Sequence, residues 1–156
     1  MTMAHDHDEG PRILAQAFLS AAEVAHVRET FARVGRDADA VASRFYERLF
    51  EYDPTLRRYF PDDMAAQREK LMLTLEHVVA SLDAMPTLLD EVSALGVRHR
   101  AYGARDLDYA TVGDALLFAL EQSTGEAWTP DAERAWEKTY TVLSQTMLRA
   151  AHESER

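Results

Sequence analysis

The chain has 156 residues, no cysteine and a formal charge of −10, with 47% hydrophobic and 28% charged residues. This composition is that of an ordinary folded protein, and its acidity argues against nucleic acid and anionic membranes as partners. The lack of cysteine excludes disulfides, thiolate catalysis and cysteine-ligated metal sites. No apolar run is long enough to span a bilayer, and the acidic start does not resemble a signal peptide. We therefore expect a cytoplasmic protein.

Residues 1–19 are predicted to form an extension in front of a single domain over 20–156. The extension is polar at its start, where His5 and His7 are separated by acidic residues. These side chains could hold a metal loosely, although so few fixed ligands make a weak site and a solvated tail is the simpler interpretation. The apolar residues at the end of the extension could add a turn of helix that packs on the domain.

Apolar residues recur at helical spacing along the whole domain, and no stretch indicates a strand. The sequence therefore predicts an all-α domain of about seven helices without an internal repeat. Helix starts are indicated by a capping box at Ser20, by Asp106 and by Thr129, and Gly35 is expected to end the first helix in a left-handed conformation. The predicted helices cover about 20–35, 37–52, 54–60, 62–85, 88–102, 106–125 and 129–151.

The helix predicted over 88–102 has a histidine where another leucine is expected. Leu88, Val92, Leu95 and His99 follow one another at steps of four, three and four, so they share one helix face. An unpaired buried imidazole costs roughly 1–3 kcal/mol, and a metal on one nitrogen with a hydrogen bond on the other would satisfy it. The alternative is a partly buried surface histidine at a helix end.

Two more polar residues fall on apolar helix faces. Tyr46 lies within the face that contains Phe45 and Leu49, so its hydroxyl needs a partner if it is buried; otherwise it is a rim tyrosine with its tip in water. Gln67 lies one turn before Leu71 on the stripe of the next helix. Its alternative is a place at the exposed beginning of that helix. Spacing alone leaves both alternatives open.

The chain carries F-Y-E-R-L-F-E-Y-D-P-T-L-R-R-Y-F at 45–60, Q-R-E-K-L at 67–71, H-R-A-Y-G at 99–103 and D-Y-A-T-V-G-D-A-L-L at 108–117. These motifs resemble the bacterial globins, and above all the haem domain of flavohaemoglobins and the single-domain bacterial haemoglobins. The resemblance extends over about 20–148. It implies a globin fold, in which three helices pack over three others around haem b (iron protoporphyrin IX).

By this resemblance, His99 matches the proximal histidine that ligates haem iron, and Tyr46 and Gln67 match the distal pair that contacts bound ligand. A backbone carbonyl near Leu95 would accept a hydrogen bond from the other His99 nitrogen. Oxygen on ferrous iron gains negative charge, which both distal side chains can stabilise. At about 1–1.5 kcal/mol for each bond, the pair would slow oxygen release by about a hundredfold.

The resemblance implies further contacts with the cofactor. Phe60 matches the phenylalanine that wedges against the porphyrin, Leu71 the aliphatic residue beside the ligand, and Tyr109 the tyrosine near the proximal histidine. Val112 shares a helix face with Tyr109 and is expected to contact haem as well. The cations that could pair with haem propionates are Lys70, Arg98 and Arg100.

One position departs from the family pattern. Where flavohaemoglobins have a glutamate that polarises the proximal histidine, this chain has Ala151. Glu153 lies about 200° further around the helix and cannot replace it. We therefore expect a weaker electron push from His99 than in flavohaemoglobins. Because the sequence stops at Arg156 without a flavin or nicotinamide domain, turnover is expected to need an external reductase.

The resemblance implies reversible binding of oxygen, nitric oxide and carbon monoxide at ferrous haem. With an external reductase, the protein is expected to convert nitric oxide to nitrate, and Tyr46 and Gln67 would stabilise the ligand. The alternatives are a non-enzymatic binder or sensor of oxygen, nitric oxide or sulfide, and a helical interaction protein that keeps the fold without haem. We expect a monomer or a weak homodimer.

Overall fold

The computed structural model describes residues 19–156, so the predicted extension, with its histidines and its possible turn of helix, lies outside the described residues except for Leu19. The described part is helical and has no strand, as the sequence predicts. None of its helices is both long enough and apolar enough to cross a membrane. In chain order the elements are α2 (Ala21–Val34), η1 (Gly35–Asp37), α3 (Ala38–Tyr52), η2 (Pro54–Tyr59), α4 (Ala65–Ala80), α5 (Met85–Ala101), α6 (Asp108–Thr124), η3 (Gly125–Ala127) and α7 (Pro130–Ser154).

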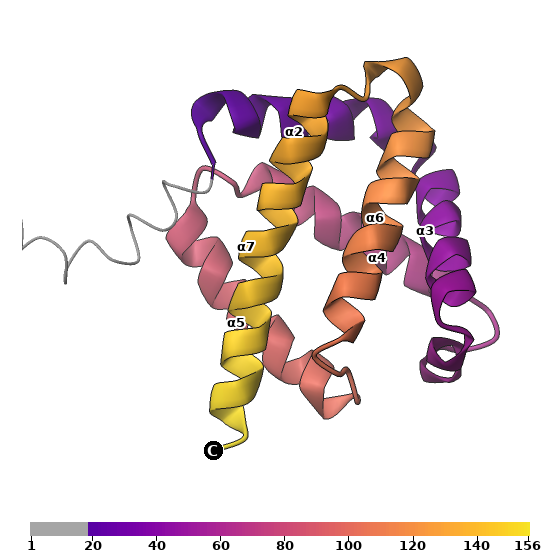
Figure 1. Ribbon diagram of the computed structural model, residues 1–156, viewed down its shortest axis with the longest axis vertical. Coiled ribbons are helices and arrows are strands. Elements are labelled where there is room, and N and C mark those ends of the chain that lie inside the picture. The colour runs from indigo at the N-terminus through magenta and orange to yellow at the C-terminus, as the bar shows by residue number, and fades with distance from the viewer. Residues whose placement is uncertain (1–18) are drawn as a thin grey trace, which may run out of the picture.

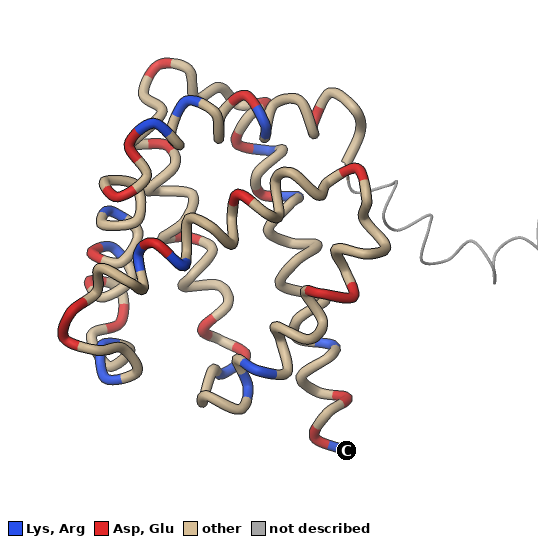
Figure 2. The backbone as a smooth tube through the Cα atoms, turned by 180° about the vertical axis from the view of Figure 1, so that it is seen from behind, with Lys and Arg blue, Asp and Glu red and all other residues tan. Residues whose placement is uncertain are grey.

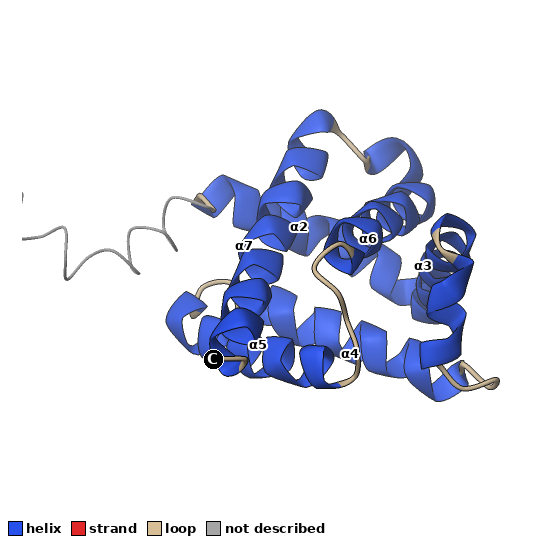
Figure 3. Ribbon diagram, turned by 60° about the horizontal axis from the view of Figure 1, so that its bottom comes forward, coloured by secondary structure: helices blue, strands red, loops and turns tan. Residues whose placement is uncertain are grey.

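The helices form two layers of three. α5 packs along α7 and α3 along α6, while α2 crosses α7 and α6, and α4 lies against α3. In Figure 1, α6 and α7 run in front of α4 and α5, and Figure 3 shows the same helices with the bottom of the molecule turned forward. One layer consists of α2, α4 and α5 and the other of α3, α6 and α7. This arrangement is the predicted three-over-three sandwich.

The close approach of α5 to α7 fixes the position of α5. Gly96 of α5 lies so near the main chain of α7 that an added Cβ would collide with the carbonyl group of Met147. Only glycine allows two helices to pack at this distance without a shift of the backbone. Gly96 precedes His99 by three residues, so the contact with α7 also determines where α5 carries its histidine.

Two of the four predicted helix-end signals, Ser20 and Thr129, are confirmed. Ser20 accepts from the Glu23 N–H at 3.1 Å while the Glu23 carboxylate accepts from the Ser20 N–H at 2.8 Å, which completes the predicted capping box. Thr129 caps α7 through the Ala132 N–H. The prediction for Gly35 was wrong: its φ is −63°, and the chain continues directly into η1 instead of reversing in a left-handed cap.

Two predicted boundaries were also wrong. The helix expected to run to residue 85 ends at Ala80, and a four-residue turn separates it from α5. Leu82 in that turn is buried, and this apolar residue prolonged the helical pattern past the true end. Asp106 does not cap α6. Its carboxylate binds Arg100 and His152, while Asp108 accepts from the backbone N–H of Arg105 at 2.8 Å.

Candidate functional site

Tyr46 of α3 lies in an aromatic cage. Its side chain is 6% exposed, and its ring packs edge to face against Phe45 and Phe60, with centroids 4.8 and 5.5 Å apart. Phe50, one turn further along α3, stacks on it at 6.0 Å. Contacts of this kind hold a ring in one orientation and contribute about 0.5–1.5 kcal/mol each beyond simple burial. The Tyr46 hydroxyl therefore points in a defined direction.

Gln67 meets that hydroxyl from α4. Its Nε2 donates to the Tyr46 oxygen at 3.0 Å, so the bond uses the oxygen as acceptor and leaves the phenolic hydrogen free. Within residues 19–156 no acceptor takes that hydrogen. Burial raises the pKa of Tyr46, and the bond from Gln67 offsets this only in part. The hydroxyl is therefore protonated at neutral pH and can donate to a third group.

His99 of α5 has one nitrogen engaged and one free. Its Nδ1 lies 2.9 Å from the carbonyl oxygen of Leu95. A carbonyl can only accept, so Nδ1 carries the hydrogen and Nε2 has a lone pair. Among the described residues nothing binds Nε2. The hydrogen bond expected near Leu95 is thus present, and the tautomer is the one that a metal requires.

The protonation state of His99 also suits a ligand role. The side chain is exposed to solvent in the absence of a cofactor, yet enough protein surrounds the ring that burial lowers its pKa. The bond to Leu95 raises the pKa, while the charges of Arg98 and Lys70 lower it further. The imidazole is therefore neutral at pH 7, the form in which histidine binds metals.

Half-buried apolar side chains accompany these polar groups. α4 and α5 are joined by a short turn, but their backbones do not pack along each other as α5 does along α7. The side chains that are packed against the core and still partly exposed include Phe60, Leu71, Leu95, Tyr109 and Val112. A flat apolar group that accepted a bond from Nε2 of His99 could cover such surfaces. The donor set and its surroundings therefore fit haem.

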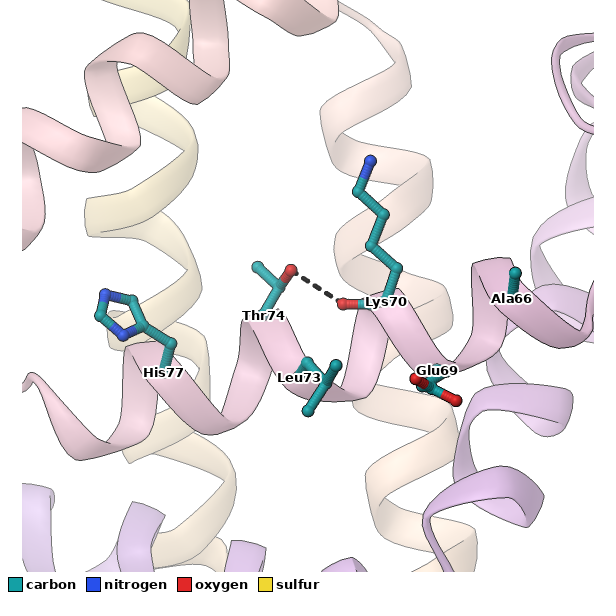
Figure 4. A pocket seen from close by; sticks show the side chains of 6 residues that line it. All are labelled: Ala66, Glu69, Lys70, Leu73, Thr74 and His77. Carbon is teal, nitrogen blue, oxygen red and sulfur yellow. Dashed lines mark hydrogen bonds between the residues drawn. The ribbon is translucent and has the colours of Figure 1, made fainter.

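Lys70 is the first of the predicted propionate partners. It lines a shallow hollow of about 380 Å³ along α4 with Ala66, Glu69, Leu73, Thr74 and His77. In Figure 4, Lys70 and Thr74 point away from α4 on the same side, and the Thr74 hydroxyl donates to the Lys70 carbonyl at 2.8 Å. His77 is exposed and pairs instead with Glu91 of α5 at 2.9 Å. Lys70 has no carboxylate partner among residues 19–156.

The two arginines differ from each other. Arg100 forms salt bridges with Asp106 and Glu155, so its charge is already compensated and it is a poor candidate for a propionate. Arg98 forms no salt bridge in the described part of the chain, and its charge acts on His99. Lys70 is therefore a better candidate than Arg100 for the partner of an acidic cofactor.

The side of the site behind His99 contains little polarity. Ala151, where a glutamate was expected from the family pattern, is fully buried. Tyr109 is half-buried, and its backbone carbonyl accepts from the Tyr140 hydroxyl at 2.6 Å. Burial raises the pKa of Tyr109. The Leu95 carbonyl is therefore the group that fixes the imidazole among the described residues.

The sequence pattern of the globin family matches residues 43–147, about two thirds of the chain. The chain therefore belongs to the globin family, whose members are haem proteins that bind oxygen. It is 29% identical over 125 residues to the flavohaemoprotein of Bacillus subtilis, a match that covers 78% of this chain and 31% of that protein. The chain thus spans about a third of the length of that relative.

Other relatives and two solved structures agree with this family. Neuroglobin-1 of Oncorhynchus mykiss is 30% identical over 137 residues, which cover 79% of this chain and 86% of neuroglobin-1. A bacterial globin from Campylobacter jejuni superposes with a TM-score of 0.75 at 14% identity over 87% of this chain and 99% of that one. A hexacoordinated haem protein from an anhydrobiotic tardigrade gives 0.74 at 17%, over 86% and 96%. These two likenesses support the fold.

Proposed function

We propose that this globin holds haem b with Nε2 of His99 as the protein ligand to iron, and that it converts nitric oxide to nitrate with an external reductase. Haem would supply an iron that can bind a diatomic gas and exchange one electron. In the overall reaction, nitric oxide, oxygen and one electron give nitrate. The electron must come from a donor in every turnover.

The free hydrogen of the Tyr46 hydroxyl is the observation that carries this proposal. A buried, protonated phenol fixed by three aromatic rings donates to a ligand with developing negative charge better than to a neutral one. Gln67 holds the phenol oxygen, so the donor is oriented before a ligand arrives. Such a pair would hold a bound oxygen long enough for nitric oxide to react with it.

The haem part of the proposal is tested by an absorption spectrum. Purified protein reconstituted with haem b should give a Soret band, and its reduced form should change on addition of oxygen and of carbon monoxide. A matched comparison is His77→Ala, which alters an exposed histidine of α4 and should leave the spectrum unchanged. A wild-type protein without a Soret band after haem addition would contradict the proposal.

The reaction itself is tested by rapid mixing. Oxygenated ferrous protein mixed with nitric oxide should form ferric haem and one equivalent of nitrate within the mixing time, and Tyr46→Phe should lower the yield because oxygen escapes first. Tyr52→Phe, at an exposed tyrosine of the same helix, is the control. Nitrate formation no faster than with free haem would argue against this activity.

A second candidate function rests on the surroundings of His99. Because a neutral backbone carbonyl at 2.9 Å binds Nδ1 and Ala151 provides no carboxylate, the imidazole donates less electron density to iron than a carboxylate-bound one would. This favours reversible binding or sensing of oxygen, nitric oxide or sulfide over rapid turnover. Tight oxygen binding combined with a slow reaction with nitric oxide would support this candidate.

A further inference from the structure

Three large apolar side chains are exposed where η2 meets the corner between α5 and α6. Tyr102 is 73% exposed, Leu107 60% and Tyr59 43%. The Tyr59 ring contacts Gly103, which lies between Tyr102 and Leu107 in the chain, and exposed apolar residues that cluster are typical of interaction surfaces. We call the surface formed by these three residues with Arg58 and Arg98 the corner face.

Two contacts make the corner face a fixed surface. The Tyr59 ring lies against Gly103, whose φ of +107° and lack of a side chain leave room for it. Arg105 of the corner bonds to Asp53, at the start of η2, at 3.2 Å, and to Asp108 at 2.8 Å. η2 and the α5–α6 corner are therefore joined at both ends of η2, and the apolar residues are presented together.

The corner face carries two arginines in an acidic protein, with Asp62, Asp63 and Asp106 close to them in the chain. Figure 2 shows the blue segments of η2 and of the α5–α6 corner at the same lower end of the molecule. Within residues 19–156, Arg58 and Arg98 form no salt bridge. The Arg58 guanidinium lies 5.1 Å from the centroid of the Tyr59 ring and donates to its hydroxyl. Positive charge thus borders the apolar residues, whereas the whole chain carries −10.

The corner face also lies next to the site described above. Tyr59 precedes Phe60, which packs on Tyr46 at 5.5 Å, and Arg98 directly precedes His99 in α5. Tyr102 follows His99 by three residues, at the end of α5. A molecule bound at the corner face would therefore lie only a few side chains from the iron ligand.

We propose that the corner face is the docking surface for the electron donor, and that this donor is an acidic redox protein. The inference rests on the proposed function, which consumes one electron in each turnover. Because the whole chain carries −10, an acidic partner is repelled by the protein as a whole. Attraction at the corner face steers the partner to the side where the electron path is short, and the exposed apolar residues provide contact area.

Salt dependence tests the proposal. Ferric haem-loaded protein is mixed anaerobically, without nitric oxide, with reduced flavodoxin as an acidic one-electron donor, and the second-order rate constant is measured at increasing ionic strength. Two proteins of like net charge without a docking surface react faster as salt is added, because screening weakens their repulsion. The corner face predicts the opposite: the rate constant falls about tenfold or more.

Matched variants locate the effect. Arg58→Glu should slow the reaction severalfold at low salt, whereas Arg36→Glu, the same charge change in η1 at the other end of α3, should change it little. Leu107→Ser should slow it, whereas Leu73→Ser on α4, with a similar exposure of 56%, should not. A rate that rises with salt, or equal effects within either pair, overturns the proposal. Since nitrate is not measured, this outcome is independent of the nitric oxide reaction.

Discussion

The two sides of the site are built in different ways. On the side of Tyr46, three aromatic rings and the Gln67 side chain fix one phenol. On the side of His99, one backbone carbonyl fixes an imidazole that solvent can reach. The first side is defined by side chains and the second by where the helix α5 lies. We therefore expect side-chain substitutions to change ligand binding on the first side, and changes in helix packing to affect the second.

The largest effect is expected from removal of the imidazole. His99→Gly should abolish the protein bond to iron, so the Soret band of the reduced protein should shift or disappear, and added imidazole should restore it in part. His77→Gly is the matched control, since His77 is an exposed helical histidine paired with Glu91. An unchanged spectrum of His99→Gly would mean that another residue ligates iron.

The next effect concerns the packing behind His99. Gly96→Ala places a Cβ against the Met147 carbonyl, and overpacking of this kind lowers the free energy of unfolding by about 1–3 kcal/mol. The control is Gly35→Ala, where the structure leaves open space and φ is −63°; this change should stabilise by about 0.4–1 kcal/mol. Urea denaturation measures both. Equal effects would show that α5 does not depend on its contact with α7.

A smaller effect is expected on the distal side. Tyr46→Phe keeps the aromatic packing but removes the free O–H, so oxygen should dissociate about five to ten times faster, which corresponds to the loss of about 1–1.5 kcal/mol. Gln67→Leu should have a similar effect, because it leaves the Tyr46 hydroxyl without the bond that positions it. Stopped-flow displacement of oxygen by carbon monoxide measures the rates. If Tyr46→Phe releases oxygen at the wild-type rate, the Tyr46 hydroxyl does not contact the bound ligand.

The smallest effect is a dependence of stability on alkaline pH. Burial raises the pKa of Tyr46 and of Tyr140 above the ordinary value of 10.0. Above that pH the unfolded chain loses these protons before the folded one, so the free energy of unfolding should fall as pH rises above about 10 and remain flat just below it. Denaturation of the haem-free protein at several pH values should show a shallower decline for Tyr46→Phe. An equal decline would mean that Tyr46 does not contribute.

Helical periodicity was sufficient to find the helices and the unusual polar residues. Tyr46, Gln67 and His99 interrupted apolar stripes, and a local signal of this kind can be read within a single turn. The turn after Ala80 was missed because Leu82 continues the pattern while the chain leaves the helix. Helix propensity and apolar spacing cannot detect a helix end when the residues after it also place an apolar side chain in the core.

Contacts between distant segments could not be predicted. Phe50 joins the cage around Tyr46, and Asp106 binds His152 rather than capping α6. The pair of Arg105 and Asp53 is separated by 52 residues. Whether two such groups meet depends on how the layers cross, which the spacing within one helix does not determine.

The contact of Gly96 with Met147 has a mechanical consequence. Main chain touches main chain there, so no side chain can rotate to absorb a displacement of α5, and α7 must share it. At its far end α7 reaches the α5–α6 corner through the bond of His152 to Asp106. An axial shift of the imidazole would therefore be transmitted along α7 to the last residues of the chain.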